Sequence, residues 1–144
     1  MIKMIHSYWA YIVLIVLIFA IVNAFLGLRA NKKFEAKDLR IALFALIASH
    51  IQLIFGFVAY YLSSFYDIMR NVGMGEVMKN SDLRKVLVEH PLVGIIAITL
   101  ITIGFSKHKK KTTDAAKFKT IAIFYTIALI LILSRIPWDL WFSN

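Results

Sequence analysis

Four long stretches without a charged side chain dominate this sequence, at residues 8–28, 41–66, 91–106 and 120–134. About 20 apolar residues carry an α-helix across the hydrocarbon core of a bilayer. The first two stretches meet that length, and Lys and Arg side chains that flank the two shorter ones can snorkel to the interface. We therefore expect an all-α membrane protein with transmembrane helices at about residues 7–29, 40–66, 84–107 and 117–141.

Short connections between the first two segments and between the last two predict antiparallel neighbours. The whole chain (residues 1–144) is then a single domain, an up-down-up-down bundle of four transmembrane helices. The longer connection at residues 67–85 contains three methionines and predicts a short interfacial helix. Candidate N-caps for the third helix are Asn80, Ser81 and Asp82.

Lysine and arginine gather on one side of the predicted bundle, and they give the chain its formal charge of +9. The two short loops carry Arg29, Lys32, Lys33, Lys37, Arg40, Lys107, Lys109, Lys110, Lys111, Lys117 and Lys119, whereas Lys3, Arg70, Lys79, Arg84, Lys85 and Arg135 lie on the other side. Because cytoplasmic loops are enriched in Lys and Arg, we expect both termini in the periplasm and the bundle in a bacterial inner membrane. The positive charge then faces lipid headgroups, and no nucleic acid partner is expected.

The composition and motifs exclude several classes of chemistry. The chain contains no cysteine, which excludes disulfides, iron–sulfur clusters, thiolate-bound zinc and covalent c-type haem attachment. It also lacks a G-x-S-x-G or H-E-x-x-H motif, a glycine-rich phosphate loop and paired carboxylates within the spans. Hydrolytic chemistry therefore has no support, and a role as a redox component stays open.

Stripes of small residues mark one face of three helices. Such stripes let neighbouring helices approach closely in a membrane. They read His6, Ala10, Val13, Leu17, Ala20, Ala24, Gly27 in the first helix; Ala42, Ala45, Ser49, Gln52, Gly56, Ala59, Ser63 in the second; and His90, Gly94, Ala97, Ile101, Gly104, His108 in the third. Two of the stripes begin with a histidine, at the same predicted end of the bundle.

His6 and His90 are the candidate cofactor ligands. The first and third helices of an up-down bundle lie diagonally across its core, so the two imidazoles can face each other at equal depth. That arrangement suits an iron held between two histidines in a b-type haem (haem b). Gly94 leaves room for the porphyrin one turn deeper, and Arg135, at the same end of the fourth helix, is the candidate cation for a propionate.

Other interpretations of the same residues stay open. His6 and His90 can be ordinary interfacial residues. They can also be two ligands of a copper or zinc ion, for which Glu89 would have to serve as a third ligand. His50 lies midway along the second helix, where an imidazole indicates function by default. It is a secondary cofactor-binding candidate, which could act as a ligand of a deeper haem, a proton relay or a quinone contact. The structural alternative is a core histidine whose ring is hydrogen-bonded to Ser49 or to another helix.

Four short motifs carry a resemblance to known proteins. At His6-Ser7-x-Trp9, His50-Ile51-Gln52-Leu53-x-x-Gly56, Glu89-His90-Pro91 and Arg135-Ile136-Pro137-Trp138, the chain resembles a family of small bacterial four-span membrane proteins labelled cytochrome b-like, over nearly its whole length. The stretch around His50 is distantly similar to the histidine helices of haem A synthase, which joins two four-helix bundles where this chain has one. Both resemblances imply haem.

The sequence thus favours an integral membrane b-type haem protein that transfers electrons at the periplasmic side, to or from a quinol or a respiratory complex. Two alternatives come from other classes: a cofactor-free accessory or assembly subunit of a larger membrane complex, and a metal-handling protein at the periplasmic face. The small-residue stripes suit contacts to foreign helices as well, so a homo-oligomer also stays open. His108, next to lysines, is expected on the cytoplasmic surface.

Overall fold

The computed structural model describes residues 1–142, and its regular elements are helical. In chain order they are α1 (Ile2–Arg29), α2 (Ala36–Tyr61), α3 (Ser64–Val72), α4 (Met74–Lys79), α5 (Ser81–Arg84), a π-helical turn (Lys85–Glu89), α6 (His90–Lys109), α7 (Asp114–Arg135) and α8 (Trp138–Phe142).

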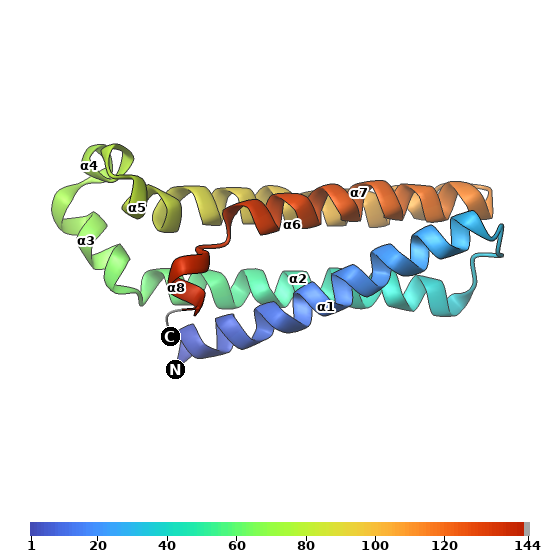
Figure 1. Cartoon of the computed structure of the whole chain (residues 1–144), viewed down its shortest axis with the longest axis horizontal. Helices are drawn as coiled ribbons and strands as arrows, with labels where there is room; N and C mark the ends of the chain where they lie inside the picture. Colours follow the sequence, from blue (N-terminus) through green and yellow to red (C-terminus); the bar gives the residue numbers. More distant parts are fainter. Residues whose placement is uncertain (143–144) are drawn as a thin grey trace.

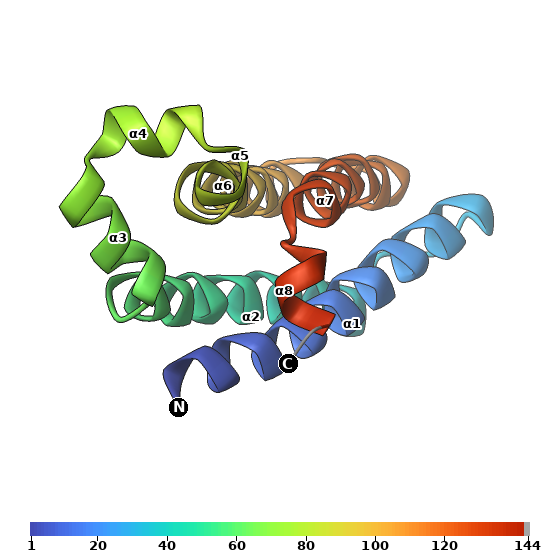
Figure 2. The same cartoon turned by 60° about the vertical axis from the view of Figure 1, so that its left-hand side comes forward.

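The long helices form the predicted up-down-up-down bundle, as Figures 1 and 2 show. Helix α1 packs on α2 and α7, and α6 packs on α7 and α2. The pairs α1/α6 and α2/α7 therefore lie diagonally across the core. The short helices α3, α4 and α5 form an arch beyond one end of the bundle and connect α2 to α6 (Figure 1). The start of α1 and the last described helix, α8, lie near that same end.

The helix ends differ from the predicted ones by a few residues. The four long helical stretches begin three to five residues earlier than expected, and α2 and α7 end early, at Tyr61 and Arg135. Ser63 ends the second span because its hydroxyl accepts a hydrogen bond from the Tyr66 N–H at 3.1 Å and caps α3 instead. The fourth span ends because the residue before Pro137 is extended, with ψ of 132°.

The connection between the second and third spans is helical rather than a loop. Asn80, one of the predicted caps, accepts hydrogen bonds from the N–H groups of Asp82 and Leu83 at 3.0 and 3.2 Å. The π-helical turn then leads directly into α6, and Pro91 lies in the first turn of that helix. Because a proline has no N–H, it leaves a carbonyl of the preceding turn without its usual helical partner.

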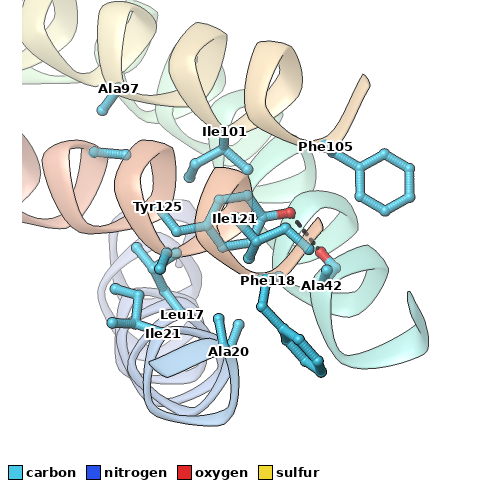
Figure 3. Packing of buried hydrophobic residues seen from close by; sticks show 14 residues of the cluster. Leu17, Ala20, Ile21, Ala42, Ala97, Ile101, Phe105, Phe118, Ile121 and Tyr125 are labelled. Carbon is cyan, nitrogen blue, oxygen red and sulfur yellow. Dashed lines mark hydrogen bonds between the residues drawn. The ribbon is translucent and has the colours of Figure 1, made fainter. Parts of the chain in front are cut away.

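The small-residue stripes form the core, as predicted. Leu17, Ala20 and Ala24 are buried in α1, and Ala97 and Ile101 are buried in α6. Figure 3 shows Leu17, Ala20, Ala97 and Ile101 among the side chains that pack between the helices. The largest fully buried side chain is Tyr125 of α7, whose hydroxyl crosses the bundle and donates to the Ala42 carbonyl at 2.8 Å (Figure 3).

The outer faces of the bundle are apolar. Within residues 1–142, four helical stretches are long and apolar enough to cross a membrane: Ile2–Arg29, Ala36–Tyr61, Ser81–Lys109 and Asp114–Arg135. In each stretch, no more than a third of the most apolar 18 residues is buried inside the bundle. A water-soluble bundle would expose its polar side chains instead. The fold therefore defines a four-span helical membrane protein.

Candidate cofactor site

The structure brings His6 and His90 together across the diagonal of the bundle. His6 lies in the second turn of α1, and His90 is the first residue of α6. Their ring centroids are 6.2 Å apart, and the ring planes are inclined by 71°. The sequence predicted this juxtaposition from two stripes and from helix topology, without any long-range contact to guide it.

The distance between the two rings matches the spacing of two imidazoles that share one metal ion. A metal–imidazole bond is about 2.0 Å, and a ring nitrogen lies about 1.2 Å from the ring centre, so opposite ligands have centroids about 6.4 Å apart. The observed 6.2 Å agrees with that value. The separation of the rings is therefore compatible with an iron held between them.

His90 is held in the orientation that a ligand needs. Its Nδ1 lies 3.1 Å from the backbone carbonyl oxygen of Arg135. A carbonyl oxygen can only accept, so Nδ1 carries the proton, and Nε2 keeps its lone pair in the neutral ring. Histidines that bind metals are typically fixed in this way, with the second ring nitrogen donating to a backbone carbonyl.

His6 is fixed by two residues of α2. The Gln52 side-chain N–H donates to the His6 backbone carbonyl at 2.9 Å. Gly56 leaves space for the ring, since a Cβ at this position would lie 3.2 Å from His6 Cε1. The His6 Nδ1 and the Gln52 Oε1 atoms are buried without a hydrogen-bond partner among the described residues. Buried polar atoms normally have a hydrogen-bond partner, so these two atoms are available to a bound group.

Gln52 and Gly56 are site residues whose contacts to His6 the sequence did not predict. Both were named only as members of the α2 stripe and of the motif that begins at His50. Their signal was an amide side chain on a face of otherwise small residues, one turn before a glycine. An amide on the buried side of a membrane helix needs a hydrogen-bond partner, and here that partner is the backbone of the histidine helix.

One side of the site is open. At Gly94, one turn beyond His90, a Cβ would have no atom of the described residues outside its own helix within 4 Å. Gly94 therefore does not itself obstruct a planar ring beside His90. The donor set suits a haem, which brings four nitrogen ligands of its own and needs only the two imidazoles.

Arg135 lies at the rim of the site. Its carbonyl holds His90, and its guanidinium lies 3.6 Å from a carboxylate oxygen of Glu89. Arg84 donates to the other oxygen of Glu89 at 2.8 Å. Two guanidinium groups thus share one carboxylate beside the imidazole pair. Glu89 is turned toward these cations, so it does not complete a three-ligand metal set with the histidines.

His50 does not join the histidine pair. Its Nδ1 lies 2.8 Å from the Leu46 carbonyl, and its Nε2 lies 3.4 Å from the Thr102 hydroxyl of α6. Thr102 follows His90 by twelve residues, which is about 18 Å of helix. The imidazole is exposed on the outside of the bundle. It contacts another helix, as one of the predicted roles required, but it is not bonded to Ser49, whose hydroxyl donates to the Ala45 carbonyl.

His108 was expected on the surface, and that prediction is wrong. It is fully buried, and its Nδ1 is hydrogen-bonded to the Phe105 carbonyl. The rings of Phe34 and Phe105 lie against it, with centroids 5.3 and 4.8 Å away. Phe34 comes from the connection between α1 and α2, which folds over the end of α6. The neighbouring lysines face outward while the histidine packs among aromatic rings.

Within residues 1–142, no group of three or more His, Cys, Asp and Glu side chains is placed to hold a metal ion. The chain has no match among protein-family models, curated proteins or solved structures. The resemblance to cytochrome b-like proteins therefore stays a prediction from the sequence motifs.

Proposed function

We propose that this chain is an integral-membrane b-type haem protein that transfers electrons, with His6 and His90 as the two axial ligands. The observation that carries the proposal is the 6.2 Å separation of the two rings across the bundle. The hydrogen bond from His90 Nδ1 to the Arg135 carbonyl supports it further, because it leaves Nε2 with its lone pair. Haem bound there would supply a one-electron couple.

The protein's own residues would tune that couple. His6 and His90 would hold a haem iron by two imidazoles, which would favour a low-spin iron suited to electron transfer rather than oxygen chemistry. The Nδ1–H of His90 bonds to a neutral carbonyl rather than to a carboxylate, which keeps the ligand neutral. Arg135 and Arg84 are the cations available to the propionates, in competition with Glu89.

The basic end of the bundle supports the proposed orientation. Lys107, Lys109 and Lys117 lie over the rings of Phe124, Phe105 and Phe34 at 5.6, 5.4 and 5.6 Å. Amines above aromatic rings at a helix end are typical of side chains that snorkel to the headgroup layer. This end is opposite to the histidine pair, so the positive-inside rule favours the proposed periplasmic side of a bacterial inner membrane for the pair.

A visible spectrum of the protein, purified in detergent from haem-replete cells, tests the proposal. We expect a Soret band and sharp α and β bands on reduction. His6→Ala and His90→Ala should each abolish the low-spin spectrum, whereas His50→Ala and His108→Ala should keep it. A colourless preparation that also fails to take up added haemin would refute the proposal and favour a cofactor-free accessory or assembly subunit.

A further inference from the structure

His50 occupies an unusual position for an imidazole. It is the fifteenth residue of the 26-residue helix α2 and so lies near the middle of a membrane span. Its side chain is exposed on the outside of the bundle, between α2 and α6. A polar side chain that faces the hydrocarbon core is costly and is typical of a functional position.

The hydrogen bonds around His50 leave one ring nitrogen with only a long contact to a donor. Its Nδ1 lies 2.8 Å from the Leu46 carbonyl oxygen and must therefore carry the ring proton. In the neutral ring, Nε2 is then an acceptor. Among the described residues its partner is the Thr102 hydroxyl at 3.4 Å, and that hydroxyl has a closer acceptor in the Ile98 carbonyl at 2.8 Å.

When the Thr102 proton goes to the closer Ile98 carbonyl, Nε2 of His50 and Oγ1 of Thr102 face each other as two acceptors. An unsatisfied acceptor in an apolar medium costs a large part of its solvation energy. A ligand that brings one O–H group to this point would give Nε2 a donor.

The surroundings of the two acceptors restrict the ligand to a lipid-soluble molecule. Large apolar side chains flank them on both helices and are exposed: Ile47 and Ile54 on α2, and Ile95 and Ile103 on α6. A polar O–H group attached to an apolar body matches this pattern of a small polar centre within an apolar rim.

We propose that His50 and Thr102 form the headgroup site for a quinol, whose hydroxyl donates to Nε2 of His50. The choice of a quinol among lipid-soluble hydroxyl compounds rests on the proposed electron-transfer function. A quinol is such a molecule, because it carries its hydroxyl groups on an aromatic ring with an isoprenoid tail. The geometry assigns His50 the role of a hydrogen-bond acceptor in binding.

The test is a titration of the purified full-length chain with decylubiquinol in detergent micelles, followed by the ¹⁵N resonances of labelled histidine. Dithionite keeps the quinol reduced, and the visible spectrum of the same sample reports whether haem is present. We expect an unprotonated Nε2 at His50 in the free protein, and an upfield shift of that resonance as quinol binds. The dimethyl ether of the same quinol, which has no O–H group, should leave it unmoved.

Three variants make the test specific. His50→Phe keeps an apolar ring and should weaken quinol binding about fivefold to tenfold, the equivalent of one hydrogen bond. Thr102→Val should weaken binding by a smaller factor. Thr99→Val is the matched control, because Thr99 lies one turn before Thr102 on α6 but donates only to the Ile95 carbonyl of its own helix. This variant should bind quinol like the unmodified chain.

Several results would overturn the assignment. They are a protonated Nε2 in the free protein, equal shifts with quinol and its dimethyl ether, or equal losses for Thr99→Val and Thr102→Val. A His50 shift that follows the protein-to-detergent ratio instead of the quinol would assign this face to a second copy of the chain. Absence of haem bands in a sample that binds quinol would refute the haem proposal alone.

Discussion

Two glycines of α6 offer a sharp test of how closely the helices pack. At Gly104, a Cβ would lie 2.4 Å from the Cβ of Phe124 in α7. At Gly94, the same substitution would meet open space. The two variants therefore carry the same substitution in the same helix, and they differ only in what the added methyl group contacts. Because the clashing atom of Phe124 is bonded directly to the backbone, a rotamer change cannot relieve the contact.

The expected change in the free energy of unfolding is the sum of two opposing contributions. Alanine is better than glycine in a helix by about 0.8 to 1.0 kcal/mol, which both variants gain. Gly104→Ala must also move α6 and α7 apart, from 2.4 Å to an ordinary contact of at least 3.4 Å, and overpacking of this kind costs about 1 to 3 kcal/mol. We expect Gly94→Ala to be stabilised, and Gly104→Ala to be less stable than Gly94→Ala by about 1 to 3 kcal/mol.

Equilibrium unfolding in mixed detergent micelles, followed by circular dichroism, measures this difference. The two proteins should unfold with the same cooperativity and with separate midpoints. Equal midpoints, or a more stable Gly104→Ala, would refute the close approach of α6 and α7 from which the argument starts. Both proteins should be prepared without added haemin, so that ligand binding does not contribute to the measured stability.

Three further predictions follow from single contacts. Tyr125→Phe removes the hydroxyl that donates to the Ala42 carbonyl and should lower the free energy of unfolding by about 0.6 to 1.7 kcal/mol, measured in the same assay. Gly56→Ala should push the His6 ring, because its Cβ would lie 3.2 Å from the ring, and the haem content of the purified protein should fall. Ser63→Ala removes the cap of α3 at a cost of about 1 kcal/mol, which should appear as faster amide exchange in α3 with no change in the long helices.

The main features of the fold could be predicted from the sequence because a membrane imposes them. An apolar stretch of sufficient length must be helical, since every backbone group needs a partner in lipid. Short loops then fix the neighbours. The spacing of Ala20, Ala24 and Gly27 also indicated correctly which face of α1 is buried. Helix ends were less predictable, because they depend on single caps such as Ser63.

The candidate site was only partly predictable. A stripe shows which way His6 and His90 point, and bundle topology shows that they share an end. A stripe does not show tertiary partners, so the contact between Gln52 and the His6 backbone was missed. The burial of His108 was missed for the same reason, because the residue that covers it, Phe34, is 74 positions away in the sequence.

The start of α6 shows how the fold holds His90 in place. Pro91 has no N–H to donate to the carbonyl four residues earlier, that of Leu87. The Tyr60 hydroxyl of α2 donates to this carbonyl instead, at 2.8 Å. The carbonyl of Arg135, at the end of α7, meanwhile accepts from His90 itself. The first turn of α6 is thus fixed from both of its neighbouring helices.

His6, the other candidate ligand, is also held in place by a neighbouring helix. The backbone of His6 is held by Gln52 of α2, and the ring lies against Gly56 of the same helix. Helix α2 therefore positions both imidazoles, that of His6 directly and that of His90 through Tyr60 and the first turn of α6. A change of tilt in α2 would alter the distance between the two rings. Since His50 also lies on α2, with Thr102 of α6 beside it, a ligand bound between these two helices would act on the element that sets the spacing of the histidine pair.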